Sequence, residues 1–258
     1  MLTPGRVLIL LGVVAALLGP VLGGCVAKKT LFPPTVLIAP YDTSEGESLW
    51  AVIPPRNESG TSVVDERAVG DAIVQSVQAT RGLRCLPLNR TIEAMRALKM
   101  ENGVQTPADA EQLAITLGCD GIVAGSITAY DPYEPPTMGL SLALYARPGA
   151  LTTQRRDVVD PYQLTRSFTD TPYVGSNFKG TPVTVASEIL DARDHSTLMA
   201  VQDYAEGRSD KQSALGWRVH LASMDLYTKF AAHQTVRRLL DEEWLRLARE
   251  VSRQNRSP

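Results

Sequence analysis

The chain has 258 residues, with 26 basic and 28 acidic side chains, a formal net charge of −2 at pH 7 and 44% hydrophobic residues. These values are ordinary for a globular protein, and the chain is not basic enough to indicate nucleic acid as a partner. The length suffices for one good-sized domain, or for one domain with a long insertion.

The first 24 residues have the composition of an export signal. Arg6 is their only charged residue, an apolar run covers residues 7–18, and Gly19-Pro20 breaks it. A positive start, an apolar stretch of this length and small residues at a cleavage site are typical of a secretory signal peptide. A membrane-spanning helix needs about 20 apolar residues, so we expect residues 1–24 to be a signal peptide.

A four-residue motif, Leu22-Gly23-Gly24-Cys25, follows this apolar region. It resembles the lipobox of bacterial lipoproteins, in which a leucine and two small residues are recognised by the signal peptidase and the cysteine carries the lipid. The resemblance implies a diacylglycerol and usually a third acyl chain, such as palmitate, on Cys25. Stable anchoring needs more than one acyl chain, so this anchor would be durable. The alternative is an ordinary signal peptide followed by a chance cysteine.

Cleavage before Cys25 would leave 234 residues, 25 of them basic and 28 acidic, with a net charge of −3. By the sorting habits of lipoproteins, Val26 in place of an Asp favours the outer membrane of a two-membrane envelope, with the protein facing the periplasm. Residues 25–34 form a short tether that reaches at most about 30 Å. We therefore expect the folded part to lie close to the membrane.

Residues 35–258 show alternating strand and helix patterns. Short apolar runs predict strands over residues 35–39, 49–54, 83–88, 120–130, 138–145 and 183–190. Apolar side chains spaced three or four apart predict helices that begin at Asp65, Asn89 and Thr106, and further helices over 194–208 and 213–252. Residues 194–208 also fit a return strand, but the spacing favours the helix.

Two of these elements have specific local signals. Thr106, Pro107 and Asp109 place a hydroxyl at the cap, proline in the first turn and an acid three residues on, and Gly118 ends that helix. In residues 138–145, large apolar side chains alternate with small ones, which predicts a strand with one buried face.

The order of elements predicts an α/β fold, a mixed sheet flanked by helices in two or three layers. One domain would cover residues 35–258, with a polar insertion at 147–182 that is longer than ordinary loops. The C-terminal helix, at about 213–252, has an apolar stripe of Val236, Leu240, Trp244, Leu247 and Val251. We expect the stripe to pack on the sheet and Glu242 to pair with Arg246 on the exposed side. Self-association through this helix is the minority alternative.

Two segments carry a family resemblance. Residues 49–60, a strand ending in Pro-Pro-Arg-Asn-Glu-Ser-Gly, and residues 117–127, which begin Leu-Gly-Cys-Asp-Gly, resemble envelope lipoproteins related to CsgG, LpoB and the amino-terminal domain of TolB. The resemblance covers residues 36–145 and its motifs shape turns and strands. It implies a domain without an active site that docks other envelope components. No functional residue carries over.

Particular members of that family differ from this chain. LpoB-type activators have a long tether, whereas this one is short. CsgG-type channels need lipid-facing hairpins of about ten alternating residues per strand. Only residues 138–145 alternate well, and residues 152–157 are too polar for a membrane wall. An oligomeric channel subunit is therefore the second hypothesis, after a docking component.

The familiar catalytic and cofactor motifs are missing, and we predict no catalytic residues, cofactor or metal. Asp191, Asp194 and His195 could ligate a metal in a hydrolase, but a solvated turn explains them better. His220 and His233 are expected on one helix, about 20 Å apart. Cys85 and Cys119 are expected in strands, either as small buried hydrophobes or as a disulfide.

The best candidate for a partner surface is formed by Tyr130, Tyr133, Pro135 and Pro136. The tyrosines would be anchors on a backbone stiffened by prolines. The alternative is a rigid strand end whose tyrosines pack on the domain. The partner is expected to be an envelope protein, and a homo-oligomer is also compatible with the sequence.

Overall fold

The computed structural model describes residues 34–44, 46–100, 103–104, 106–147, 150–151, 181–210 and 213–254. These residues belong to one compact unit, Pro33–Pro258. The predicted signal peptide, Cys25, nearly all of the tether and most of the insertion lie outside the described residues.

The described strands are β1 Ser48–Val52, β2 Arg56–Asn57, β3 Leu83–Cys85, β4 Gly121–Asp131, β5 Thr137–Ala146 and β6 Thr184–Asp191. The described helices are α2 Glu66–Gln78, α3 Leu88–Ala97, α4 Pro107–Leu117, α6 His195–Ala205, the 3₁₀ turn η2 Gly216–Arg218, α7 Val219–Ala222 and α8 Met224–Gln254. No helix in this part of the chain is both long and apolar enough to cross a bilayer.

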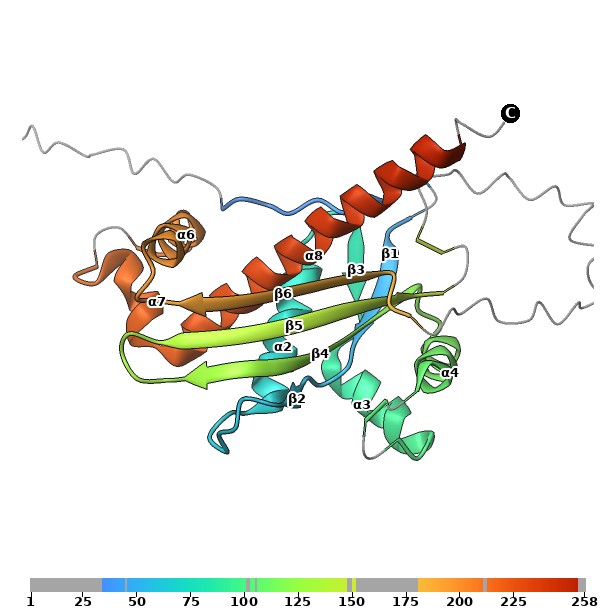
Figure 1. The fold of residues 1–258 in the computed structure, drawn as a ribbon, viewed down its shortest axis with the longest axis horizontal. Coiled ribbons are helices and arrows are strands. Elements are labelled where there is room, and N and C mark those ends of the chain that lie inside the picture. Colours follow the sequence, from blue (N-terminus) through green and yellow to red (C-terminus); the bar gives the residue numbers. More distant parts are fainter. Residues whose placement is uncertain are drawn as a thin grey trace, which may run out of the picture. The chain divides into compact units, whose positions relative to one another are not determined.

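The strands form one mixed sheet in the order β3-β1-β4-β5-β6, and β2 pairs with β4 beside this path. β1 is parallel to β3 and to β4, whereas β4, β5 and β6 are antiparallel to one another in turn. The predicted α/β fold class, a mixed sheet flanked by helices with a long C-terminal helix, is confirmed (Figure 1).

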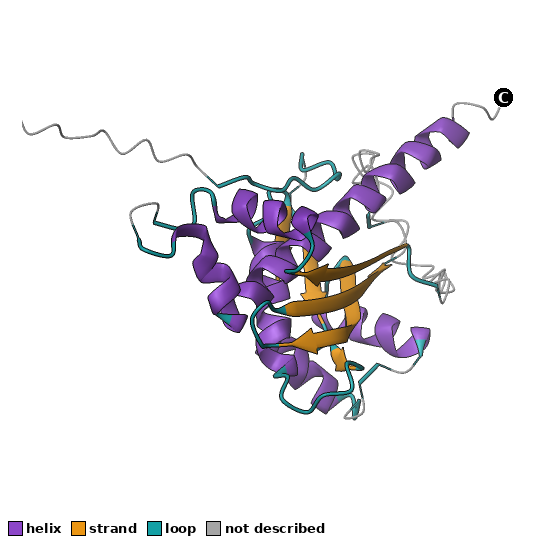
Figure 2. Ribbon diagram, turned by 60° about the vertical axis from the view of Figure 1, so that its left-hand side comes forward, coloured by secondary structure: helices purple, strands orange, loops and turns teal. Residues whose placement is uncertain are grey.

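Helices cover the two faces of the sheet unequally. α2 links β1 to β3, and it packs with α8 on the face where the larger hydrophobic cluster lies. α3 and α4 link β3 to β4, and a smaller cluster lies beneath them on the opposite face. Trp50 belongs to the first cluster and its neighbour Ala51 to the second, because successive side chains of a strand point to opposite faces. Most helices are therefore on one side of the strands (Figure 2).

In the described part of the chain, the small helical layer covers only part of its face of the sheet. α8 packs on β5 and β6 from one side, and the alternating Met138, Leu140, Leu142 and Leu144 are all at most 1% exposed there. On the opposite face of β6, Val185 and Ile189 are 51% and 66% exposed. We call the face of β4, β5 and β6 on which these two side chains lie the open face.

Two of the helix starts predicted from the sequence, at Asp65 and Thr106, are present. The carboxylate of Asp65 accepts from the backbone N–H groups of Arg67 and Ala68 at the start of α2. Thr106 and Asp109 form a reciprocal capping box at α4. Gly118 ends that helix at φ 65°, a left-handed conformation that glycine adopts without steric cost.

Three predicted boundaries were wrong. Residues 35–39 form no regular strand, and only Ile38 makes an isolated bridge, to Arg81. The strand predicted over 83–88 ends at Cys85, since α3 begins at Leu88. The cap of α3 is therefore Pro87 and not Asn89.

The single helix predicted over 213–252 was also wrong in its first part. Ser223 has extended backbone angles, φ −126° and ψ 115°, and separates α7 from α8. Val236, Leu240 and Leu247 of the predicted stripe are buried, but Trp244 and Val251 are 51% and 40% exposed.

Glu243, next to Trp244, takes the buried position instead and is fully buried. Its carboxylate accepts from the Tyr41 hydroxyl at 3.0 Å and from the Thr184 hydroxyl. Arg246 donates to it from Nε at 2.8 Å and from the terminal nitrogen at 2.5 Å. The predicted Glu242–Arg246 pair is replaced by this buried one, because Glu242 pairs with Arg238.

Arg246 extends the network to the insertion. Its guanidinium donates to the Leu151 carbonyl at 2.9 Å and to Glu250 at 2.7 Å. Burial disfavours the charged guanidinium, but the hydrogen bonds and charge of Glu243 outweigh this and raise the pKa of Arg246. Burial, together with the Glu243 charge, raises the pKa of Tyr41 well above its ordinary value. The guanidinium of Arg246 is thus charged at neutral pH, and the Tyr41 hydroxyl keeps its proton.

Replacing Arg246 by methionine should destabilise the fold strongly. Breaking a buried pair leaves an uncompensated charge, which costs about 3–5 kcal/mol. The matched control is Arg238→Met, which removes an arginine whose side chain is 54% exposed and should cost less than about 1 kcal/mol. Urea unfolding followed by tryptophan fluorescence measures both. Equal losses for the two variants would contradict the role given to Arg246.

Candidate functional site

The end of β4 and its connection to β5 carry the four residues predicted as a partner surface, with Tyr130 in the strand and the other three in the connection. Tyr133 is 80% exposed. Tyr130 is half-buried and packs against the larger hydrophobic cluster, Pro135 is half-buried and Pro136 is buried. Burial, followed by the charges of Asp225 and Asp65, raises the pKa of Tyr130.

The backbone of this connection is held on both sides. The backbone N–H of Tyr133 donates to the Asp131 carboxylate at 3.1 Å. The Pro136 carbonyl accepts from the backbone N–H of Ala192 at 3.0 Å, and Arg193 lies 4.0 Å from the Asp131 carboxylate. The connection therefore holds one exposed aromatic side chain on a fixed backbone. The two interpretations from the sequence therefore apply to different tyrosines. Tyr130 packs on the domain, and Tyr133 is exposed as expected of an anchor for a partner.

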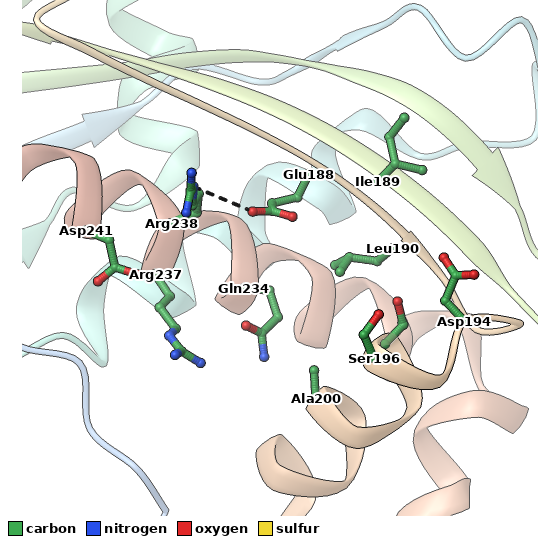
Figure 3. Close-up of a pocket in the computed structure, with 11 residues that line it drawn as sticks. Glu188, Ile189, Leu190, Asp194, Ser196, Ala200, Gln234, Arg237, Arg238 and Asp241 are labelled. Atoms are coloured by element: carbon green, nitrogen blue, oxygen red, sulfur yellow. Dashed lines mark ion pairs between the residues drawn. The ribbon is translucent and has the colours of Figure 1, made fainter.

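A second feature, not predicted from the sequence, is a groove between β6, α6 and α8 with a volume of about 360 Å³. We call it the edge groove. It is lined by Glu188, Ile189 and Leu190 of β6, by Asp194, Ser196, Thr197 and Ala200 at and in α6, and by Gln234, Arg237, Arg238 and Asp241 of α8. Figure 3 shows Glu188 pointing toward Arg238, while Ile189 points away from the groove.

The charges of the edge groove are mixed in sign. Arg238 lies 3.9 Å from Glu188 and 3.0 Å from Glu242. The Arg238 side chain is 54% exposed, so these pairs contribute little to folding stability. The groove is therefore a charged surface available for contacts, and it has few of the apolar walls that small-molecule sites have.

The residues weighed as a metal site lie at the start of α6. The Asp191 carboxylate accepts from the backbone N–H of Arg193 at 2.9 Å and pairs with its guanidinium at 3.4 Å. These interactions, the backbone hydrogen bond first, lower the pKa of Asp191. Asp194 precedes His195 as the helix cap. Within the described ranges, no group of three or more His, Cys, Asp or Glu residues is placed to hold a metal.

The two C-terminal histidines are closer than predicted, because His220 is on α7 and not on the same helix as His233. Both rings contact Tyr204 of α6, with centroid distances of 5.4 Å for His220 and 5.0 Å for His233. The guanidinium of Arg208 lies over the Tyr204 ring, 4.3 Å from its centroid. The cluster joins α6, α7 and α8.

Cys85 and Cys119 are free and buried, so the expectation of two small buried hydrophobes is confirmed over the disulfide. Cys119 was predicted in a strand but lies between α4 and β4. Burial is the largest cause that raises the pKa of Cys85 to about 12 and that of Cys119 to about 11. Both thiols are therefore protonated at neutral pH and poorly reactive.

A larger cavity, of about 660 Å³, lies between residues 54–57, the start of α2 and α3. Met95 and Met100 contribute apolar lining, and Arg56, Arg67 and Arg96 contribute charged lining. Met100 and Gly103 in its lining come directly before and after residues that the structure does not describe, and we assign the cavity no ligand.

No protein-family model matches this chain, and no curated protein matches it. Among solved structures, the C-terminal domain of LpoB from Salmonella enterica is 14% identical, with a TM-score of 0.32 over 38% of this chain and 71% of that one. The lipoprotein GNA1162 from Neisseria meningitidis is 18% identical, with a TM-score of 0.30 over 38% and 72%. The hypothetical protein CT253 from Chlamydia trachomatis is 13% identical, with a TM-score of 0.35 over 76% and 98%.

These matches include LpoB, so that part of the resemblance predicted from the sequence has a counterpart among solved structures. The CsgG and TolB parts of the resemblance stay predictions. At TM-scores of 0.30 to 0.35, the likeness carries no argument about function.

The stability of the domain should fall in mild acid because of His233. Burial, with the charges of Arg208 and Arg237, lowers the pKa of His233 from 6.5 to about 4. The unfolded chain therefore takes up this proton more readily. Above pH 6.5 His233 is neutral in both states and leaves the free energy of unfolding unchanged. Between pH 6.5 and pH 4 the free energy of unfolding falls, by about 3 kcal/mol in total.

Thermal unfolding between pH 7 and pH 4.5 measures this effect. His233→Gln should flatten the dependence of the melting temperature on pH, while the control His195→Gln, which changes an exposed histidine, should leave the slope unchanged. The same slope in both variants would rule out His233 as the titrating group.

Proposed function

We propose that this chain is a lipoprotein of the bacterial outer membrane that faces the periplasm and acts as a non-catalytic docking or assembly component of an envelope complex. Two features support the proposal. The lipobox-like residues Leu22-Gly23-Gly24-Cys25 follow an export signal, and the β4–β5 connection presents Tyr133 on a fixed backbone.

The exposed Tyr133 is the observation that carries the docking role. Large aromatic side chains such as tyrosine are enriched among the residues that dominate binding energy at protein interfaces. A side chain on a backbone that is already held loses less conformational entropy on binding. Tyr130, Asp131 and Pro136 provide that support, and Tyr133 is the anchor that a partner would cover.

Lipidation at Cys25 would place this anchor near the membrane. The tether before the first described residue, Pro34, is short, so the domain would stay within about 30 Å of the lipid. A partner reached in this way is itself a membrane protein or lies close to the membrane surface. The channel-subunit hypothesis stays a prediction of the sequence analysis.

Changing Cys25 tests the anchor. Cys25→Ala should abolish incorporation of labelled palmitate and release the protein from membranes, because the acyl chains supply the membrane affinity. Val26→Asp is the companion variant, which should keep the label but move the protein to the inner membrane. Labelled or membrane-bound Cys25→Ala protein would contradict the assignment of the anchor.

Changing Tyr133 tests docking. A photo-crosslinking amino acid at position 133 should capture one partner in intact cells. The matched control is the same amino acid at Trp244, an aromatic position that is 51% exposed on α8. Tyr133→Ala should lower partner co-purification at least tenfold, as expected for a residue worth about 1.4 kcal/mol or more. Identical adducts at positions 133 and 244, or none at 133, would refute the docking role of this residue.

A further inference from the structure

β6 is the last strand of the sheet formed by the described residues, so one of its edges has no neighbouring strand there. In an antiparallel ladder, the N–H and C=O of a residue point to the same side, and alternate residues point to alternate sides. Ala192 donates to Pro136 at 3.0 Å, in line with the register that pairs Asp191 with Thr137, which indicates that the even-numbered residues of β6 bond to β5. Val183, just before the strand, donates to Leu144 outside this register. The backbone groups of Val185, Ser187 and Ile189 therefore point to the free edge.

Among the described residues, this edge has little of the usual protection against pairing. Edge strands are commonly blocked by proline, lysine, a bulge or an inward charge. β6 has no proline, no lysine and an unbroken register with β5 over Thr184–Asp191. Its inward charge, Glu188, has Arg238 at 3.9 Å. Val185 and Ile189 are exposed on the open face beside the free backbone groups. The edge is suited to accept another strand.

We propose that β6 pairs with β6 of a second copy of this chain, antiparallel and with the two-fold axis at Ser187. Across the axis, odd-numbered residues have to meet odd-numbered residues, because only they present backbone groups to the edge, and an axis that passes through a residue meets this condition. Ser187 lies near the middle of Thr184–Asp191, so this register pairs nearly the whole strand. The two sheets then form one continuous sheet.

The side chains of β6 fit this register. Val185 of each copy lies opposite Ile189 of the other, and Ser187 lies opposite itself. Pairs of β-branched apolar residues directly opposite one another stabilise a sheet, and here they cover the two most exposed apolar side chains of β6. On the other face, Glu188 lies opposite Ala186, so the two Glu188 carboxylates are not directly opposed.

The edge groove also favours a second copy as the occupant. A two-fold interface brings the same surface of both copies together. If residue i of one copy contacts residue j of the other, then residue j of the first copy contacts residue i of the second. α8 presents Arg237 and Arg238 one turn before Asp241 and Glu242. Two such helices approaching in opposite directions can place the arginines of each against the carboxylates of the other. An unrelated peptide would have no reason to match both the register and this charge order.

Site-specific crosslinking tests the pairing in the full, lipidated chain. Ser187→Cys places a thiol at the proposed axis, and a short bis-maleimide should join two copies into a covalent dimer in membranes and in detergent extracts. The control is Thr128→Cys, which is exposed on β4 away from the axis. Cys85 and Cys119 are buried with raised pKa values, so they give little background reaction.

Charge substitutions test the register. In the Ser187→Cys chain, the double change Val185→Lys with Ile189→Lys should lower the crosslinked fraction at least about tenfold, and so should Val185→Glu with Ile189→Glu, because like charges are directly opposed. Mixing the two variants should restore the crosslink. These side chains are exposed, so the fold should be kept.

Crosslinking of Ser187→Cys no greater than that of Thr128→Cys would overturn the proposal, as would crosslinking that the charge substitutions leave unchanged. The inference does not depend on the proposed function, since partner capture at Tyr133 and dimerisation at β6 are measured separately and on different elements.

Discussion

A single buried charge pair connects segments that are far apart in the sequence. Glu243 is fully buried and accepts hydrogen bonds from Tyr41 near the start of the domain, from Thr184 in β6 and from Arg246 one turn further along α8. Removing two charges from water is costly unless all of their hydrogen-bonding groups are satisfied. The positions of α8, of the last strand and of the N-terminal segment therefore depend on one another.

The sequence predicted those elements whose signals are local. The capping box at Thr106 and the alternation in β5 each depend on residues a few positions apart, and both were confirmed. Apolar spacing alone placed Trp244 in the core, whereas Glu243 is buried there because Tyr41 and Thr184 supply its partners. The break at Ser223 likewise has no proline or glycine to reveal it.

The candidate sites also differ in whether a local sequence signal could identify them. Tyr133 was identified from a short run of tyrosines and prolines, and its exposure could not be separated from that of Tyr130 until the packing was known. The edge groove combines β6, α6 and α8, whose proximity follows from the topology of the sheet and not from any motif. Apolar Val185 and Ile189 on the second face of β6 were the available sign, but a central strand would look the same.

The network on α8 also holds the two ends of the insertion. The carbonyl of Leu151, near the start of the insertion, accepts from Arg246, and the hydroxyl of Thr184, just after its end, donates to Glu243. Both ends are thus hydrogen-bonded to α8, and these hydrogen bonds do not involve residues 152–180. A nick in that segment would leave the described strands paired, and a circularly permuted chain with new termini there would keep every contact of the α8 network.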